Sequence, residues 1–358
     1  MNCDFGGRAM RCFGVISAVV SSAFVGSVAK AGVVIETVTV GNPGNAGELS
    51  GEGAGGMGLD RICGAVDYVY NIDKFEITAG QYTEFLNAVA AVDTYGLYDE
   101  HMGDPLTEDV WGCNIQRGGT SGSYTYSVAS DWGNRPVNYV SWGDAARFAN
   151  WLHNGQPTGA QVLGTTEDGS YLLNGATSNE GLTAVMREEG ATWVIPSEDE
   201  WHKAAYHKND GVTGEYFDFP TSSDSVPAND LVEPSDPGNN ATFYDAQWPD
   251  PVGWTIGSPY YRTEAGAHEN SESPYGTLDQ GGNVWEWNES VFYGWARGIR
   301  GGSFSFDDIT LDGATRVQWV GSGLEGYDLG FRVAYISEPA TLALLALGGV
   351  TILGKKRR

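Results

Sequence analysis

The chain has 358 residues, of which 41% are hydrophobic and 12% aromatic, enough for one large domain or two small ones with a buried core. Its 46 acidic residues outnumber 20 basic ones and give a formal charge of −26, which excludes nucleic acid and anionic lipid heads as electrostatic partners. The 12 Trp and 51 Gly predict irregular, Gly-hinged loops anchored by large buried rings rather than a helix-rich architecture.

Residues 1–31 have the features of a secretory signal. Two arginines precede an apolar run over residues 13–28, and Ala29-Lys30-Ala31 fits the small-x-small cleavage pattern. A single membrane anchor is the alternative, but the run is short for a span and is interrupted by Ser and Gly. We therefore expect the mature chain to begin at Gly32, outside the cytoplasm.

Three helix starts carry capping signals. In each, a Ser or Thr is followed three residues later by Gln, Asp or Glu: Thr78 with Gln81, Ser141 with Asp144, and Ser197 with Glu200. Apolar residues at helical spacing follow each start and predict one buried face per helix. These residues are Tyr82, Phe85, Leu86 and Val89 in the first helix, Ala145, Phe148, Ala149 and Leu152 in the second, and Trp201, Ala204 and Ala205 in the third.

The rest of the chain is predicted to form short strands and loops. Content in β-branched and aromatic residues predicts strands over 68–72, 75–77, 192–195, 284–287 and 331–335. The Gly-rich stretch 41–58 has no periodicity and is predicted to be a loop. The expected fold class is α+β, loop-rich, with short strands and few helices.

Two cysteines remain after the predicted signal. Because an isolated pair in an oxidising compartment is most often bonded, Cys63 and Cys113 are predicted to form a disulfide. A reactive pair is the alternative, although neither residue lies in a CxxC sequence.

Six motifs resemble those of one known family. Residues 297–306 read Arg-Gly-Ile-Arg-Gly-Gly-Ser-Phe-Ser-Phe, residues 281–287 read Gly-Gly-Asn-Val-Trp-Glu-Trp, and residues 330–332 read Gly-Phe-Arg. Together they resemble the signature of sulfatase-modifying factors, a family that includes the formylglycine-generating enzyme. Blocks at 75–78, 136–142 and 195–201 resemble further family landmarks in the expected order. The resemblance extends over about 38–335 and implies a variant of the C-type-lectin fold.

The family's enzymes oxidise a substrate cysteine, and this chain lacks the cysteines that carry out that reaction. In the family's enzymes two cysteines after the Arg-Gly-Gly-Ser run bind copper and oxidise a substrate cysteine, whereas the matching positions here are Phe306 and Leu311. Copper(I) sites need sulfur donors, so copper is not expected. The family's active-site groove would include Trp285 and Ser303, with Phe306 as an apolar wall.

Calcium is the metal that the resemblance implies. Carried over by position, the ligands would be the side chains of Asp279 and Glu286 and the carbonyls of Gly282 and Val284; hard oxygen donors of this kind favour calcium. The alternative places Glu286 in a buried hydrogen-bond network.

A second family site would use Asn240 and the Ala241 carbonyl, although its acidic partner cannot be aligned. Arg300, Arg316 and Arg332 are expected to bond carbonyls and carboxylates within a loop-rich core, with ligand binding as the alternative.

The C-terminal segment 337–358 combines Glu338-Pro339, an apolar run and a basic end. It resembles the PEP C-terminal sorting signal that exosortase-type transpeptidases remove from exported proteins of Gram-negative bacteria, but has Ser337 in place of the usual Pro. Such a segment would insert transiently into the membrane, and the alternative is a retained anchor.

These features predict an exported domain over 32–336 at the cell surface or in the extracellular matrix. The leading hypothesis is a calcium-stabilised binding module for a peptide or saccharide that lacks the family's oxidase chemistry. The alternatives are an oxygen-dependent oxidase of protein cysteine, which could use Cys63 or Cys113, and a structural surface protein.

Overall fold

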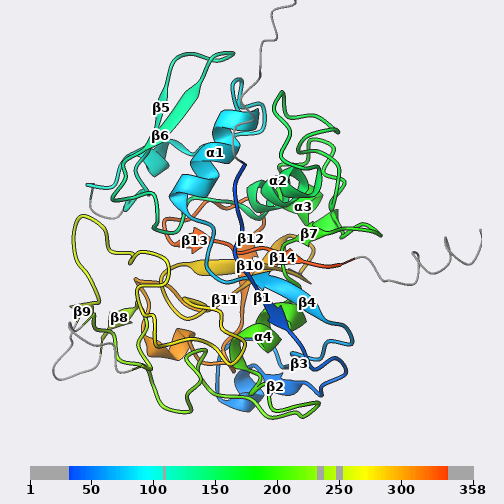
Figure 1. The fold of residues 1–358 in the computed structure, drawn as a ribbon, viewed down its shortest axis with the longest axis vertical. Coiled ribbons are helices and arrows are strands. Elements are labelled where there is room, and N and C mark those ends of the chain that lie inside the picture. The colour runs from blue at the N-terminus through cyan, green and yellow to red at the C-terminus, as the bar shows by residue number, and fades with distance from the viewer. Residues whose placement is uncertain (1–31, 108–109, 232–237, 247–252, 338–358) are drawn as a thin grey trace, which may run out of the picture. The chain divides into compact units, whose positions relative to one another are not determined.

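The computed structural model describes residues 32–107, 110–231, 238–246 and 253–337 (Figure 1). The predicted signal at 1–31 and all of the predicted sorting segment except Ser337 lie outside the described residues. Within the described ranges, no helix has the length and apolarity needed to cross a membrane.

The described chain combines short helices with short strands. The α-helices are α1 (Ala79–Val89), α2 (Trp142–His153), α3 (Asn179–Ala184) and α4 (Glu198–Tyr206), and the 3₁₀ helices are η1 (Glu52–Ala54), η2 (Glu100–Gly103) and η3 (Asp308–Thr310). The strands are β1 (Thr37–Val40), β2 (Glu48–Ser50), β3 (Arg61–Cys63), β4 (Tyr70–Asp73), β5 (Ile115–Gly118), β6 (Thr125–Val128), β7 (Trp193–Val194), β8 (Tyr244–Asp245), β9 (Gly253–Trp254), β10 (Trp285–Phe292), β11 (Ala296–Arg300), β12 (Val317–Gly321), β13 (Leu329–Gly330) and β14 (Ala334–Tyr335). This content agrees with the predicted fold class.

All three predicted helix starts are confirmed. Thr78, Ser141 and Ser197 each accept a hydrogen bond from the backbone N–H three residues later, at 3.2 Å, and the reciprocal capping-box bond is present in each case. Because these bonds satisfy N–H groups that have no partner inside the helix, they fix where α1, α2 and α4 begin.

The predicted apolar faces of these helices are buried. In the main core Phe148 of α2 packs edge-on against Phe85 of α1, with ring centroids 5.2 Å apart, and against Phe331, at 5.4 Å. Figure 1 shows α1, α2 and α3 on one side of the central strands, and α4 with the β2–β3 hairpin on the other. The core therefore joins helices from the first half of the chain to the segment between β13 and β14.

Two four-stranded sheets lie at the centre. The first has the order β1-β4-β14-β7 and is antiparallel throughout. The second has the order β12-β11-β10-β13, in which β10 and β13 run parallel.

Several predicted strand bounds were wrong. No strand forms at 75–77, because the Ile77 N–H donates to the Phe331 carbonyl and the Ile77 carbonyl accepts from Val137, outside any ladder. The stretch 41–58 contains β2 and η1 instead of loop alone, and the strand predicted at 284–287 continues to Phe292.

A buried carboxylate fixes α4 to the second sheet. Glu198, the first residue of α4, accepts from Arg316 Nε at 2.6 Å and from Arg300 Nε at 3.0 Å. Arg61 Nη1 donates to its other oxygen at 2.8 Å. Burial works to raise the pKa of Glu198, but the two buried guanidinium groups outweigh it and hold that pKa below its ordinary value. The structural role expected of Arg300 and Arg316 is therefore confirmed.

The predicted disulfide is wrong for this structure. Cys63 and Cys113 are both free and buried. Arg300 Nη2 donates to the Cys63 sulfur at 3.3 Å, whereas Cys113 belongs to the main hydrophobic core. The two residues belong to different parts of the interior, a separation that cysteine counting cannot detect.

Replacing Glu198 with Gln should destabilise the fold by roughly 3–5 kcal/mol, because Arg300 and Arg316 would be left buried without their counter-charge. Urea unfolding would measure this loss, with Glu180→Gln, an exposed carboxylate on α3, as the matched control. A change as small as the control's would contradict the role assigned to Glu198.

Candidate functional site

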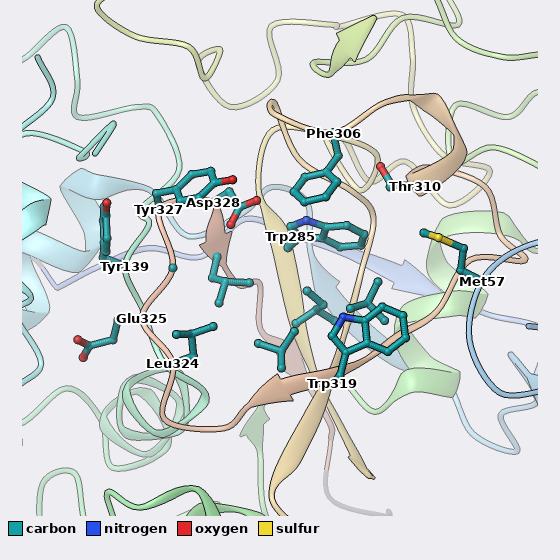
Figure 2. Close-up of a pocket in the computed structure, with 15 residues that line it drawn as sticks. Met57, Tyr139, Trp285, Phe306, Thr310, Trp319, Leu324, Glu325, Tyr327 and Asp328 are labelled. Atoms are coloured by element: carbon teal, nitrogen blue, oxygen red, sulfur yellow. The ribbon is translucent and has the colours of Figure 1, made fainter. Parts of the chain in front are cut away.

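A pocket of about 550 Å³ opens beside the second sheet (Figure 2). Most of its lining is apolar. The lining residues are Met57, Tyr139, Trp285, Ile299, Phe306, Thr310, Val317, Trp319, Val320, Leu324, Glu325, Gly326, Tyr327, Asp328 and Leu329. A concave, largely apolar site with a few polar groups is the usual form of a small-ligand or side-chain binding site.

Two of the three predicted groove residues form one wall of this pocket. Trp285 and Phe306 pack edge-on with ring centroids 5.6 Å apart, as Figure 2 shows. The Trp285 N–H donates to the Asp328 carbonyl at 2.8 Å, beside the parallel pairing of β10 with β13. Phe306 is 41% exposed, so its ring is available to a ligand.

The third predicted groove residue lies behind the wall. Ser303 is buried, and its hydroxyl donates to Asp328 Oδ2 at 3.0 Å. Burial raises the pKa of Asp328 to about 6, although hydrogen bonds from Ser303 and Ser305 work to lower it. Ser303 therefore orients an acidic side chain of the pocket instead of lining it.

A second acidic side chain of the lining is held by neighbouring carboxyl groups. Burial raises the pKa of Glu325 to about 10, and the nearby charges of Asp144 and Asp99 add to the rise. Asp144 is itself the buried residue that completes the α2 capping box with Ser141. Glu325 is thus protonated at neutral pH and links the pocket loop to the start of α2.

Leu311, which the resemblance aligns with the second cysteine, lies elsewhere. It is fully buried in a small cluster with Phe219, Ala241 and Phe243, and its carbonyl accepts from the Tyr206 hydroxyl. None of the described lining residues is a cysteine. Phe306 and Leu311 therefore belong to two different environments.

The structure places Glu286 in a buried ion pair. Its two oxygens accept from Arg332 Nε at 2.6 Å and Nη2 at 2.7 Å, and Trp201 Nε1 donates to one of them at 2.7 Å. This agrees with the hydrogen-bond alternative for Glu286 and with the structural role expected of Arg332. A cation bound to Glu286 would share these oxygens with a guanidinium.

The other implied calcium ligands lie around a tight turn. Gly282 has φ of +83°, and an added Cβ would stand 2.1 Å from the Thr242 carbonyl oxygen, so only glycine fits there. Val284 is buried, and Asp279 Oδ2 accepts from the Gly266 N–H at 2.6 Å.

Buried Glu76 adds a further carboxyl to this region, with Oε2 bonded to Asn283 and Oε1 without a hydrogen-bond partner. The described residues contain no group of three His, Cys, Asp or Glu side chains that could hold a metal, so an ion here would need backbone carbonyls as well.

At the second implied calcium site, Asn240 is buried and its N–H donates to the Ser271 hydroxyl at 2.9 Å. The Ala241 carbonyl accepts from the Thr255 hydroxyl at 3.4 Å.

The loop between β12 and β13, which lines the pocket, was not predicted from the sequence. Trp319, Leu324, Glu325, Tyr327 and Asp328 all belong to it or to the preceding strand β12. The available signal was a run of aromatic and acidic residues between glycines, immediately before the Gly-Phe-Arg motif.

Residues 66–336 match the model of the sulfatase-modifying factor enzyme 1-like domain. The chain belongs to this family. Membership accounts for the six motifs, and it confirms the C-type-lectin-like fold that their resemblance implied.

Solved structures resemble this family member at low identity. The crystal structure of CarF is 20% identical, with a TM-score of 0.46, and the match covers 85% of this chain and 99% of that one. The Treponema denticola variable protein 1 is 18% identical, with a TM-score of 0.49 and 84% and 94% covered.

PvdO from Pseudomonas aeruginosa is 16% identical, with a TM-score of 0.43 and 85% and 92% covered. No curated protein matches the sequence.

Replacing Glu325 with Gln in this sulfatase-modifying-factor domain should raise its thermal midpoint by several degrees at pH 8 and have little effect at pH 4. Between about pH 4.3, where an unfolded Glu titrates, and its folded pKa of about 10, unfolding releases a proton, so stability falls as pH rises. An amide removes this dependence. Calorimetry across this pH range checks the effect, and a gain independent of pH would contradict it.

Proposed function

We propose that this domain is a binding module that uses the Trp285–Phe306 pocket and does not perform the family's cysteine oxidation. The observation that carries the proposal is the aromatic ring of Phe306, which lines the pocket at the position of a reactive thiol. An apolar wall there favours retention of a ligand over thiolate chemistry.

The two available thiols do not support the oxidase alternative. Burial raises the pKa of the Cys63 thiol and that of the Cys113 thiol, which disfavours the reactive thiolate. Neither residue lines the pocket. Recruiting either one would require the fold to open.

The character of the wall favours a peptide side chain over a saccharide as the ligand. Trp285, Phe306 and Trp319 offer ring surface, and Ile299, Val317, Val320, Leu324 and Leu329 add aliphatic surface. Binding a saccharide would demand several polar partners, because each buried hydroxyl must keep a hydrogen bond. An apolar side chain needs none.

Calcium stabilisation and export are the remaining parts of the proposal. Buried Asp279, Glu286 and the unpartnered oxygen of Glu76 supply more carboxyl groups than Arg332 alone neutralises, which supports a hard cation at the turn near Gly282. The sequence patterns at the two ends of the chain support export to a Gram-negative cell surface and processing by an exosortase-type enzyme.

The function is tested in two arms. Purified 32–336 incubated with copper(I), oxygen and a Cys-x-Pro-x-Arg peptide should form no aldehyde by mass spectrometry, beside a cysteine-bearing relative that does. Selection from a random heptapeptide phage library should enrich peptides that bind the wild type but not Trp319→Ala. Aldehyde formation would overturn the proposal, as would peptides that bind both forms equally.

Calcium is tested by thermal unfolding with calcium and with chelator. Calcium should raise the midpoint, because an ion that binds only the folded state stabilises it. Asp279→Asn should abolish the difference. Glu286→Gln is not diagnostic, because it would remove the carboxylate that pairs with Arg332 in both conditions. Equal wild-type midpoints in calcium and chelator would contradict the proposed site.

A further inference from the structure

We propose that the ligand of this pocket carries a cationic group, an ammonium or guanidinium, beside an apolar one, and that Asp328 and the surrounding rings receive the cation. This inference rests on the proposed binding function and names the chemical class of the ligand. It follows from how aromatic rings and acidic groups are distributed around the pocket.

The pocket has two chemically different ends. Figure 2 shows Trp319 and Met57 at one end, Trp285 and Phe306 between, and Tyr139, Tyr327, Asp328 and Glu325 at the other. The first end offers apolar surface. The second combines ring faces with carboxyl groups, and a cation is attracted to both.

The lining has acidic side chains but no basic ones. Its fifteen described residues include Glu325 and Asp328 and no Lys, Arg or His. Glu325 keeps its proton at neutral pH, since burial beside Asp144 raises its pKa to about 10. Asp328, with a pKa of about 6, carries the negative charge there. An anionic ligand would be repelled by the Asp328 carboxylate, because no basic residue of the lining could pair with the ligand.

The groups that face Asp328 leave its charge available. Ser303 and Ser305 donate hydroxyl hydrogen bonds to Oδ2, and the Tyr139 hydroxyl donates to the Val110 carbonyl. Arg262 is the buried cation nearby, and its Nη atoms donate to the carbonyls of Trp111 and Gly112 at 2.8 and 3.0 Å. The charge of Arg262 works to lower the pKa of Asp328, which favours the ionised carboxylate, but Arg262 does not line the pocket. A ligand cation in the pocket can therefore still pair with Asp328.

Three probes of matched shape test the inference: 3-phenylpropylamine, 3-phenylpropanol and 3-phenylpropionate, titrated calorimetrically into 32–336 at pH 7.5. The amine should bind roughly tenfold more tightly than the alcohol, and the carboxylate more weakly than both. Asp328→Asn should remove the preference for the amine, whereas Glu180→Gln should preserve it.

A pH series on the wild type gives a second measurement that needs no variant. The amine stays protonated between pH 5 and 8, so its advantage should shrink as Asp328 gains a proton near pH 6. If amine and alcohol bind equally at pH 7.5, the inference of a cationic ligand is wrong, but the assignment of the pocket as a binding site is not affected. If none of the probes binds, the inference and the assignment of the pocket fail together.

Discussion

The buried carboxylate of Glu198 is the interaction on which the arrangement of the site depends. It begins α4 and ties that helix to Arg300 at the end of β11 and to Arg316 just before β12. Those two strands supply pocket residues Ile299, Val317 and Trp319, so the wall is held in place from behind. A charge network in the interior therefore braces the two strands from behind, in addition to the ladder that pairs them.

The family motifs act in this chain mainly as structural braces. Arg332 of the Gly-Phe-Arg motif pairs with Glu286 of the Gly-Gly-Asn-Val-Trp-Glu-Trp motif, which joins two segments 46 positions apart. Gly302 of the Arg-Gly-Gly-Ser run has φ of +75°, and an added Cβ would meet Thr310 at 2.4 Å. Such requirements hold whether or not thiols follow them, so the fold itself does not depend on a cysteine at these positions.

The sequence predicted local features well and long-range pairing poorly. The capping boxes at Thr78, Ser141 and Ser197 were confirmed because their signals lie within four residues. Strand β12 was not predicted. It pairs with β11, and the pairing contains a register shift that no local sequence pattern encodes.

Some residues of the candidate site could be predicted from the sequence, and others could not. Trp285 and Phe306 could be placed by motif alignment, whereas the loop that carries Glu325 and Asp328 could not. Its role depends on contacts with α2 and with Ser303 that only the fold creates.

The position of β14 has a consequence for the order in which the molecule matures. This strand, at Ala334–Tyr335, sits between β4 and β7, and Ala334 pairs with Ile72. The first sheet stays split until residues 334–335 have been made, since this interior strand is the last of the described strands. The sheet that joins residues from near both ends of the described chain can therefore close only late in synthesis, after most of the other strands exist.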